Sequence, residues 1–316
     1  MKEIKTLILG NYQPDFVAKV QAVNPSTTHL RTFTEEDLRT YLPGTEILFL
    51  RSKPKMDPPT IDMAKHLRLI LRAGVGLDHL DLPYLAEKNI TVRSTPGANA
   101  DSVAEHTLGM LLSLLHSIVQ ANREVSQFIW NRSPNRGTEL SALTVGIVGY
   151  GHTGSALGRR IQHLAGKTVA YDKYKKGFGH EKVQEVSLHT LLAEADVISF
   201  HVPLTEETKH WVDENFLAAL DKPIWLLNLS RGPVVKLASL PPALESGVLK
   251  GVGLDVLEHE PLSKDKLTEE ETQMYQALFD HPRVICSPHI GGWSHQSEEK
   301  ILATLYRHFL TYLTSS

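Results

Sequence analysis

Short apolar runs alternate with amphipathic segments over the first part of the chain. The runs Thr6–Leu9, Glu46–Leu50 and Leu69–Arg72 are typical of buried strands. The spacing of apolar residues between them predicts helices over Gln13–Val23 and Asp57–His66. Strands that alternate with helices in this way indicate an α/β fold with a parallel sheet.

The pattern changes near residue 100, where a long helix is predicted over residues 101–122. Ser102 and Glu105 have the spacing of a capping box, and residues 108–115 carry leucines at helical intervals. A stretch rich in polar residues, proline and glycine follows as far as Gly137. This stretch ends the first series of strands and helices.

A second α/β series begins with the predicted strand Thr144–Val148. Further strands are expected at Thr168–Tyr171, Val197–His201, Ile224–Asn228, Gly251–Asp255 and Val284–Ser287. The last segment, Ser297–Leu313, has the pattern of an amphipathic helix. Because the chain has 316 residues, two domains are expected.

Composition is that of an ordinary globular protein, with 41% hydrophobic and 22% charged residues. A net charge of -3 offers no cationic surface for nucleic acid or an anionic membrane, so neither is an expected partner. No apolar run reaches the ~18 residues of a membrane span. The one cysteine, Cys286, lies in an apolar run and is expected to be a buried strand residue, which suits a cytoplasmic protein. No metal site is expected.

A glycine-rich loop follows Thr144–Val148. Gly149–Gly154 reads GYGHTG, which has the GxGxxG spacing of a dinucleotide-binding loop. The first glycine permits a tight turn, the second lets the backbone approach a pyrophosphate, and the third lets the next helix pack on its strand. A segment compatible with that helix, Ser155–Leu164, follows, and its N-terminus would offer N–H groups to the phosphates.

A carboxylate stands at the end of the next predicted strand. Asp172 lies roughly twenty residues beyond the glycines, where a carboxylate holds the adenosine ribose hydroxyls. Its negative charge would repel the 2′-phosphate of NADP, so NAD is the expected cofactor. Lys173, Lys175 and Lys176 follow closely and could partly tolerate a phosphate.

Three motifs follow later strands of the second series. They are Asn228–Gly232 (NLSRG), Gly253–Pro261 (GLDVLEHEP) and Ser287–Gly292 (SPHIGG). Ligands of an open parallel sheet bind beyond the carboxyl ends of its strands. The arginine, glutamate and histidine of these motifs can therefore converge on one cleft.

The motifs, in this order, resemble those of the D-isomer-specific 2-hydroxyacid dehydrogenase family. The resemblance extends to Arg72–Asp78, Val103–Glu105 and His201–Thr205, and thus to nearly the whole chain. It implies an α/β fold of two parallel-sheet domains, Rossmann-like and flavodoxin-like, with the active-site cleft between them. Residues 1–99 and 293–316 would form the substrate domain, and residues 100–292 the NAD-binding Rossmann domain.

The resemblance also implies the catalytic residues. His289 would be the acid/base that protonates the keto oxygen, and Glu260 its carboxylate partner, which favours imidazolium. Arg231 would bind the substrate carboxylate and polarise the carbonyl. Asp255 would anchor the nicotinamide carboxamide. The residues implied to contact the cofactor are Gly149, Gly151, His152, Thr153, Gly154, Asp172, Val202, Leu229, Ser230, Asp255, Gly291 and Gly292.

Within the family, the chain resembles D-3-phosphoglycerate dehydrogenases most. The implied substrate-binding residues are Arg51, Ser52, Arg72, Gly74, Val75, Gly76 and Arg132. Their three arginines could supply the cationic donors that a phosphate needs. D-3-phosphoglycerate and 3-phosphohydroxypyruvate are therefore the expected substrates. His79, Pro233, Lys236 and Trp293 depart from the subgroup's pattern and leave the size of the substrate open.

Two alternatives remain on the sequence alone. One is a glyoxylate or hydroxypyruvate reductase, and the other is an NAD-binding protein similar to the corepressors that share this fold. Formate oxidation is disfavoured, because that subgroup pairs its histidine with glutamine rather than with a carboxylate like Glu260. The predicted helix at residues 101–122 and the polar stretch after it resemble the segment through which family members form homodimers.

Overall fold

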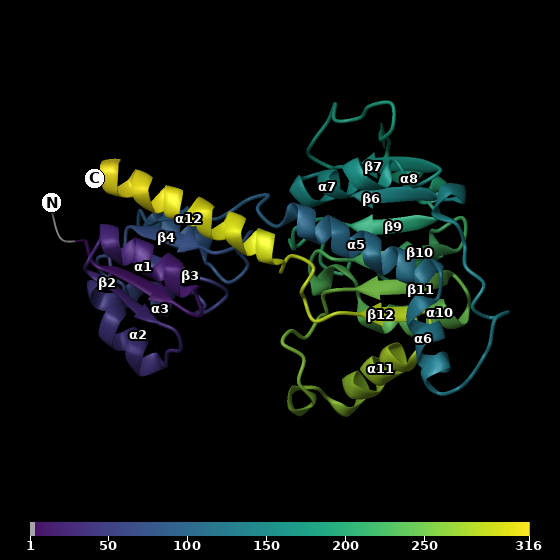
Figure 1. Ribbon diagram of the computed structural model, residues 1–316, viewed down its shortest axis with the longest axis horizontal. Coiled ribbons are helices and arrows are strands. Elements are labelled where there is room, and N and C mark those ends of the chain that lie inside the picture. The colour runs from purple at the N-terminus through teal and green to yellow at the C-terminus, as the bar shows by residue number, and fades with distance from the viewer. Residues whose placement is uncertain (1–3, 316) are drawn as a thin grey trace. The chain divides into compact units, whose positions relative to one another are not determined.

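The computed structural model of the chain describes residues 4–315, and the chain divides into two compact units. The smaller unit comprises Met1–Asn99 and His295–Ser316, and the larger unit comprises Ala100–Ser294 (Figure 1). Residues 4–315 form one sheet of five strands and one of seven, and all pairings between these strands are parallel. The predicted α/β fold with two parallel sheets is confirmed.

The smaller unit has the strand order β2-β1-β3-β4-β5, which is that of flavodoxin-like sheets. Its elements are β1 (Thr6–Leu9), α1 (Pro14–Val23), β2 (Thr27–Leu30), α2 (Glu35–Tyr41), a 3-10 helix (Leu42–Gly44), β3 (Ile47–Leu50), α3 (Pro58–Met63), β4 (Leu69–Arg72), α4 (Leu82–Glu87), β5 (Thr91–Arg93) and α12 (His295–Ser315).

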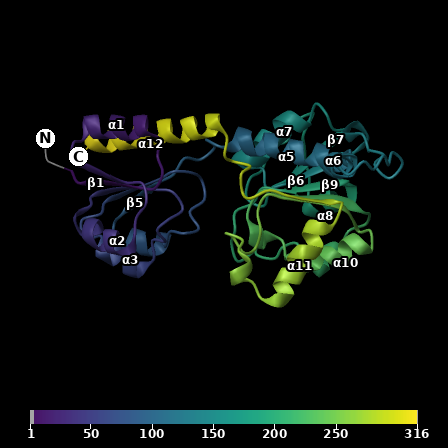
Figure 2. The same cartoon turned by 60° about the horizontal axis from the view of Figure 1, so that its bottom comes forward.

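Alternation along the strands of the smaller unit divides its core into two layers. Ile8 and Phe49 point to the face covered by α1 and α12, whereas Leu7 and Leu48 point to the face covered by α2, α3 and α4. Figure 2 shows α1 and α12 side by side above the sheet, with α2 and α3 below it. The last helix of the chain, fully buried at Phe309, thus completes the core of the first part of the sequence.

The larger unit has the order β12-β11-β10-β9-β6-β7-β8, so the chain changes direction across the sheet between β6 and β9. Its elements are α5 (Ala100–Leu115), α6 (Ile118–Ser126), a 3-10 helix (Leu140–Ala142), β6 (Thr144–Val148), α7 (His152–Ile161), β7 (Lys167–Tyr171), β8 (Gln184–Glu185), α8 (Leu188–Glu194), β9 (Val197–Phe200), α9 (Glu214–Ala218), β10 (Ile224–Asn228), two 3-10 helices (Gly232–Val234 and Leu237–Ser239), α10 (Leu240–Glu245), β11 (Leu249–Leu254), a 3-10 helix (Lys264–Lys266), α11 (Glu269–Asp280) and β12 (Val284–Cys286).

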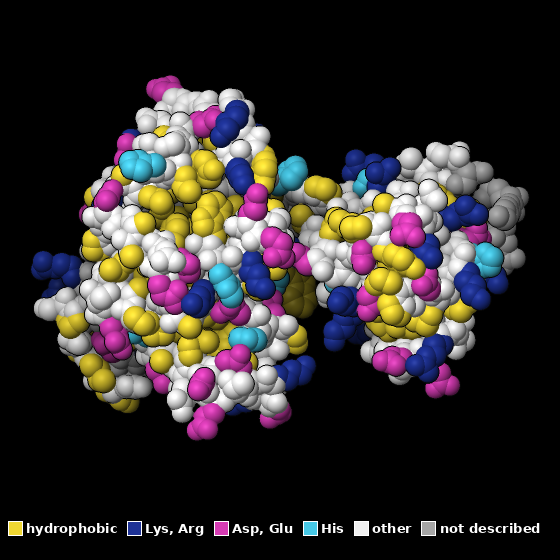
Figure 3. All heavy atoms as spheres, turned by 180° about the vertical axis from the view of Figure 1, so that it is seen from behind, with side chains coloured by type: hydrophobic (Ala, Val, Ile, Leu, Met, Phe, Trp, Pro, Cys, Tyr) yellow, Lys and Arg dark blue, Asp and Glu magenta, His cyan; other side chains and the backbone are white. Residues whose placement is uncertain are grey.

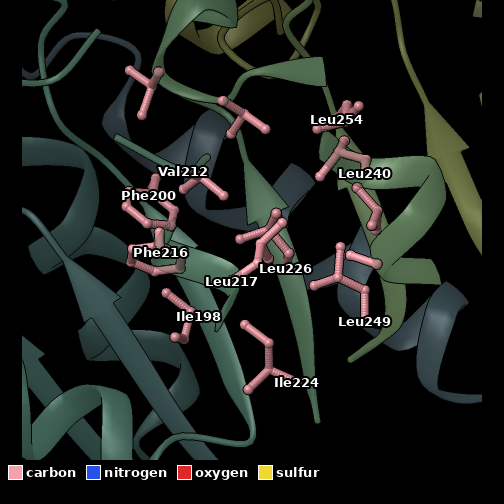
Figure 4. Packing of buried hydrophobic residues seen from close by; sticks show 14 of the residues in the cluster. Ile198, Phe200, Val212, Phe216, Leu217, Ile224, Leu226, Leu240, Leu249 and Leu254 are labelled. Carbon is pink, nitrogen blue, oxygen red and sulfur yellow. The ribbon is translucent and has the colours of Figure 1, made fainter. Parts of the chain in front are cut away.

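Helices cover both faces of this second sheet. α5 and α7 pack on one face, and α8 to α11 pack on the other. Figure 4 shows the second layer, in which Phe216 and Leu217 of α9 and Leu240 of α10 pack against Ile198 and Leu226 of the strands. Strands buried on both faces are expected of a parallel sheet, and their near-continuous apolar runs made them visible in the sequence.

The predicted helix over residues 101–122 is wrong as a single helix. α5 ends at Leu115 and α6 begins at Ile118, and the two axes are bent by 61°. Ser117 between them has a φ of +52°, a left-handed conformation that interrupts the helical hydrogen bonds. The predicted capping box is also absent, because α5 begins before Ser102, whose hydroxyl donates to the Gly291 carbonyl oxygen at 2.7 Å.

In the part of the chain that the structure describes, residues 4–315, no single helix is long and apolar enough to cross a membrane. The bent pair α5 and α6 meets the length and composition limits only when taken together. On the face of the larger unit that Figure 3 shows, acidic and basic side chains are intermixed.

Candidate active site

The three predicted catalytic residues follow three neighbouring strands. Arg231 follows β10, Glu260 follows β11, and His289 follows β12. Because β10, β11 and β12 are adjacent and parallel, their carboxyl ends share one edge of the sheet. The structure brings the three side chains together there: His289 Nδ1 lies 2.6 Å from Glu260 Oε2, and Arg231 is close enough to act on the His289 charge.

The Glu260 carboxylate determines the proton arrangement of His289. An ionised carboxylate can only accept, so Nδ1 of His289 carries the proton in this hydrogen bond and Nε2 is left for other chemistry. The hydrogen bond to Glu260 and its negative charge raise the pKa of His289 above the ordinary value, against opposition from burial and from Arg231. The pair therefore favours an imidazolium that can donate a proton from Nε2.

The carboxylate of Asp255 shapes the segment that carries His289. Asp255 is 2% exposed at the end of β11, and Oδ1 accepts the Ser287 hydroxyl at 2.6 Å and the Ile290 N–H at 2.9 Å. Oδ2 accepts the Gly291 N–H at 2.7 Å. A Cβ on Gly291 would lie 2.7 Å from Oδ2, so this close approach requires glycine. Asp255 therefore holds the segment on both sides of His289.

His289 itself adopts an uncommon backbone conformation, with a φ of +56°. Non-glycine residues in the left-handed region cost on the order of 1–3 kcal/mol and persist only where surrounding contacts impose them. Here the His289 N–H donates to the backbone carbonyl oxygen of Asp255 at 2.7 Å. The imidazole, which is half exposed, is thus fixed at the edge of the sheet rather than packed in the core.

Sequence reasoning did not include His106 of α5 in the site. Its Nε2 lies 2.9 Å from the Ser287 hydroxyl and 3.6 Å from Asp255 Oδ1. His106 therefore extends the hydrogen-bonded group around Asp255. His106 lies in the first helix of the larger unit, far from Ser287 in the sequence. No sequence pattern therefore predicts that the two residues are in contact.

Asn228 orders the turn that carries Arg231. The Asn228 side-chain oxygen accepts the N–H of Ser230 at 3.1 Å and its hydroxyl at 2.7 Å, while its Nδ2 donates to the Arg231 carbonyl oxygen at 2.9 Å. Arg231 Nη1 donates to the Ser230 carbonyl oxygen at 2.7 Å. The guanidinium thus bonds with its own turn, in which Leu229 and Ser230 are buried.

The glycine loop has the geometry that a pyrophosphate requires. Gly149 has a φ of +89°, and a Cβ there would lie 2.6 Å from the His201 carbonyl oxygen and 2.9 Å from Val202 Cγ1. A Cβ on Gly154 would lie 1.9 Å from the Gly149 carbonyl oxygen, whereas one on Gly151 would meet nothing within 4 Å. Gly149 and Gly154 thus permit close packing within the protein, whereas Gly151 leaves open space at the start of α7.

The first turn of α7 follows this open space. No side chain caps the helix at Gly151, so its first N–H groups are available to an anion. His152 is exposed and Thr153 half-buried on that turn. The open space at Gly151 and the uncapped first turn of α7 thus fit a dinucleotide phosphate.

Asp172 lies at the end of β7, next to the glycine loop. Its carboxylate accepts N–H groups from Tyr150 at 2.8 Å and from Tyr174 and Lys175 at 2.9 Å each. Burial opposes ionisation of Asp172, but these three backbone donors outweigh it and hold the pKa below its ordinary value. The nearby Lys173 bonds with Glu207 at 2.6 Å, which offsets its positive charge. A fixed negative charge here disfavours a 2′-phosphate.

The predicted substrate-binding residues fall on both units. In the smaller unit, Gly74 has a φ of +125°, and its N–H donates to the Thr95 hydroxyl at 3.2 Å. Arg72 Nη1 donates to the Ala73 carbonyl oxygen at 2.7 Å, and Val75 and Gly76 are half-buried in the same loop.

Arg51, at the end of β3, is engaged within the smaller unit. Its guanidinium makes a bidentate ion pair with Glu298 of α12 and lies 4.6 Å from the centre of the Tyr12 ring. Ser52 beside it is exposed. Arg132 belongs to the larger unit, where it is exposed in the segment after α6.

Comparison with known proteins identifies the family. Residues 108–291 match the profile of the D-isomer specific 2-hydroxyacid dehydrogenase, NAD binding domain. The chain is 32% identical over 267 residues to hydroxypyruvate reductase of Thermotoga maritima, a match that covers 84% of each chain. The chain belongs to the D-isomer-specific 2-hydroxyacid dehydrogenase family. It is accordingly an NAD-dependent D-2-hydroxyacid dehydrogenase.

Other members of the family differ in length and in substrate. D-3-phosphoglycerate dehydrogenase of Bacillus subtilis is 32% identical over 88% of this chain, but the match covers only 50% of that protein. The solved structure of D-lactate dehydrogenase from Aquifex aeolicus with NAD and lactic acid has a TM-score of 0.88 and 29% identity, and covers 98% of this chain and 96% of that one. The comparisons thus establish the family and NAD but leave the substrate open.

Among residues 4–315, no group of three or more His, Cys, Asp or Glu side chains is placed to hold a metal ion. Glu258, His259 and Glu260, which are consecutive and metal-binding in type, are directed to different partners. Cys286 is half-buried in β12, and burial raises the pKa of its thiol to about 12, so it stays protonated.

The first prediction concerns the proton on His289. Because Glu260 stabilises the imidazolium, the Glu260→Gln variant should have a lower His289 pKa than the wild type. Proton NMR titration of the imidazole, assigned with a His289→Gln variant, measures this. In the reductive direction the rate should fall as pH rises through the His289 pKa, and this fall should occur at lower pH in Glu260→Gln. Glu271→Gln, which removes the carboxylate bonded to His259, is the matched control and should leave the His289 pKa unchanged. An unchanged His289 pKa in Glu260→Gln would contradict the prediction.

Proposed function

We propose that this dehydrogenase reduces a small, unphosphorylated 2-keto acid, with hydroxypyruvate and glyoxylate as the expected substrates, using Arg231, Glu260 and His289. The observation that supports the catalytic assignment is the 2.6 Å contact between His289 and Glu260 at the edge of the sheet that also carries Arg231. A proton donor and a fixed cation beside each other suit a ketone that gains negative charge on oxygen during reduction.

Each residue would have a separate task. NADH, when bound, supplies the hydride. The Nε2–H of the His289 imidazolium would donate its proton to the keto oxygen, after which the neutral ring keeps its Nδ1–H bonded to Glu260. Arg231 would bind the substrate carboxylate with its planar fork of donors. Asp255, whose carboxylate already accepts three hydrogen bonds, would hold the His289 segment and, as the family implies, receive the nicotinamide carboxamide.

The two units would divide the binding work. We propose that residues 100–292 bind NAD through the glycine loop and Asp172, and that residues 1–99 and 293–316 act as the substrate domain. In the smaller unit, the backbone of Gly74, Val75 and Gly76 would receive the substrate carboxylate. The left-handed φ of Gly74 supports this role, because it turns the loop sharply after β4.

The ion pair of Arg51 favours a substrate without a phosphate. Arg51 is one of the three arginines predicted to bind a phosphate, but both of its terminal nitrogens bond with Glu298, whose side chain is only 13% exposed. A phosphate that approached Arg51 would have to displace this carboxylate or accept its repulsion. The sequence predicted 3-phosphohydroxypyruvate as the substrate, whereas this ion pair supports the alternative, hydroxypyruvate or glyoxylate.

A phosphorylated substrate remains the second candidate for a specific reason. Several phosphoglycerate dehydrogenases are 32–33% identical to this chain, and Arg72 and Arg132 are two further cations from the predicted set. Arg72 belongs to the smaller unit and Arg132 to the larger unit.

The second prediction tests the substrate. With NADH, wild-type kcat/KM for hydroxypyruvate or glyoxylate should exceed that for 3-phosphohydroxypyruvate by about tenfold or more, which corresponds to ~1.4 kcal/mol. Glu298→Gln should raise the relative rate on the phosphorylated substrate because it removes the competing charge. Glu299→Gln, an exposed neighbour on α12, is the control. A wild-type preference for 3-phosphohydroxypyruvate would overturn the unphosphorylated assignment.

The third prediction concerns assembly. We propose that the enzyme is a homodimer that associates through α6 and the segment after it. None of the α6 residues is buried, and Phe128 and Trp130 are 99% and 81% exposed, which is costly for aromatic side chains in water. Sedimentation equilibrium should show a dimer that Trp130→Glu weakens. A wild-type monomer at micromolar concentration would refute the proposal.

A cytoplasmic location remains a prediction.

A further inference from the structure

Three consecutive residues after β11 are bonded to four different parts of the larger unit. The Glu258 carboxylate reaches the segments that follow β9 and β10, and the His259 ring bonds with Tyr275 and Glu271 of α11. The Glu260 carboxylate bonds with His289. The structure thus gives Glu258 and His259, as well as Glu260, defined partners.

The Glu258 carboxylate uses both of its oxygens. Oε1 lies 2.7 Å from Nε2 of His210, and Oε2 accepts the Leu237 N–H at 2.8 Å. The Glu258 side chain is 17% exposed, so water competes little for these bonds. Hydrogen bonds to an ionised carboxylate are also stronger than neutral ones. Glu258 therefore ties its own segment to two others.

The three segments are in direct backbone contact as well. The His210 N–H donates to the Pro233 carbonyl oxygen at 2.7 Å, and Val212 forms a parallel bridge with Val235. A Cβ on Gly232 would lie 1.8 Å from the Leu257 carbonyl oxygen. The residue directly after Arg231 thus touches the residue directly before Glu258. Any loosening at Glu258 would act on the spacing between Arg231 and Glu260.

We propose that Glu258 is a positioning residue that fixes the Arg231 guanidinium relative to the His289–Glu260 pair, an inference that rests on the function proposed above. Glu258 acts through Leu237 and His210 and does not itself take part in proton transfer. Without it, the segment after β10 is held to the segment after β11 by fewer bonds. A misplacement of about 1 Å between reacting groups can cost on the order of a hundredfold in rate.

The test compares Glu258→Ala with the wild type on the keto acid that the wild type reduces best. The variant should lose roughly 10- to 100-fold in kcat/KM, with a raised KM for the keto acid because Arg231 is displaced. NADH affinity, followed by nicotinamide fluorescence, should change much less than kcat/KM, since the glycine loop and Asp172 follow β6 and β7. Glu214→Ala is the matched control, because Glu214 pairs with Lys236 of the same segment at 2.9 Å without reaching the Glu260 segment.

Two further comparisons separate positioning from a general loss of structure. His210→Gln can still donate to Glu258 and should keep more activity than His210→Ala. If Glu258 acts through Arg231, its removal should cost much less in an Arg231→Lys background than in the wild type.

Some outcomes would overturn the inference alone. The inference would be overturned if the wild type is active and Glu258→Ala has the same kcat/KM. It would also be overturned if the fold-losses in kcat/KM of Glu258→Ala and Arg231→Lys multiply fully when the two substitutions are combined. A fall in NADH affinity and melting temperature that matches the fall in kcat/KM would assign Glu258 a purely structural role. A wild type that reduces no 2-keto acid would instead overturn the proposed function, and this role with it.

Discussion

Parallel pairing of β10, β11 and β12 is the constraint on which the site depends. It brings the ends of three strands, far apart in the sequence, to one edge of one sheet. Arg231, Glu260 and His289 each lie a few residues beyond such an end. Short loops then complete the placement: Asn228 orders the turn at Arg231, and Asp255 orders the segment at His289. The placement of these three side chains thus depends on the parallel pairing of the strands that they follow.

Two carboxylates at this edge act in different ways because their environments differ. Asp255 is buried and accepts hydrogen bonds from a hydroxyl and two backbone N–H groups, so its charge stabilises the backbone of the segment that carries His289. Glu260 is partly exposed and bonds with an ionisable ring, so its charge raises the pKa of His289. A third carboxylate, Glu298, pairs with Arg51 in the smaller unit. Under the proposed function, this pair leaves one cation fewer for a substrate phosphate. The surroundings of each carboxylate, rather than its residue type, thus decide what its charge stabilises.

The sequence predicted most of the fold where apolar runs were continuous. β1, β4, β6 and β10 have the bounds that the pattern predicts, because strands buried on both faces are apolar over most of their length. β2, β5 and β8 were missed, since these edge strands are short and half polar. The helix breaks at Ser117 because that residue has a left-handed backbone conformation, which the residue types around it do not predict. The pairing of Arg51 with Glu298 was also not predictable, because it joins positions 247 apart that only tertiary packing brings together.

The account is tested most directly by a crystal structure of the enzyme with NADH and oxamate, an unreactive analogue of a small 2-keto acid. We expect His289 Nε2 and the Arg231 guanidinium to lie within hydrogen-bond distance of the analogue, beside the C4 position of the nicotinamide, with Glu260 still bonded to Nδ1. A complex in which His289 points to bulk solvent, away from the nicotinamide, would contradict it.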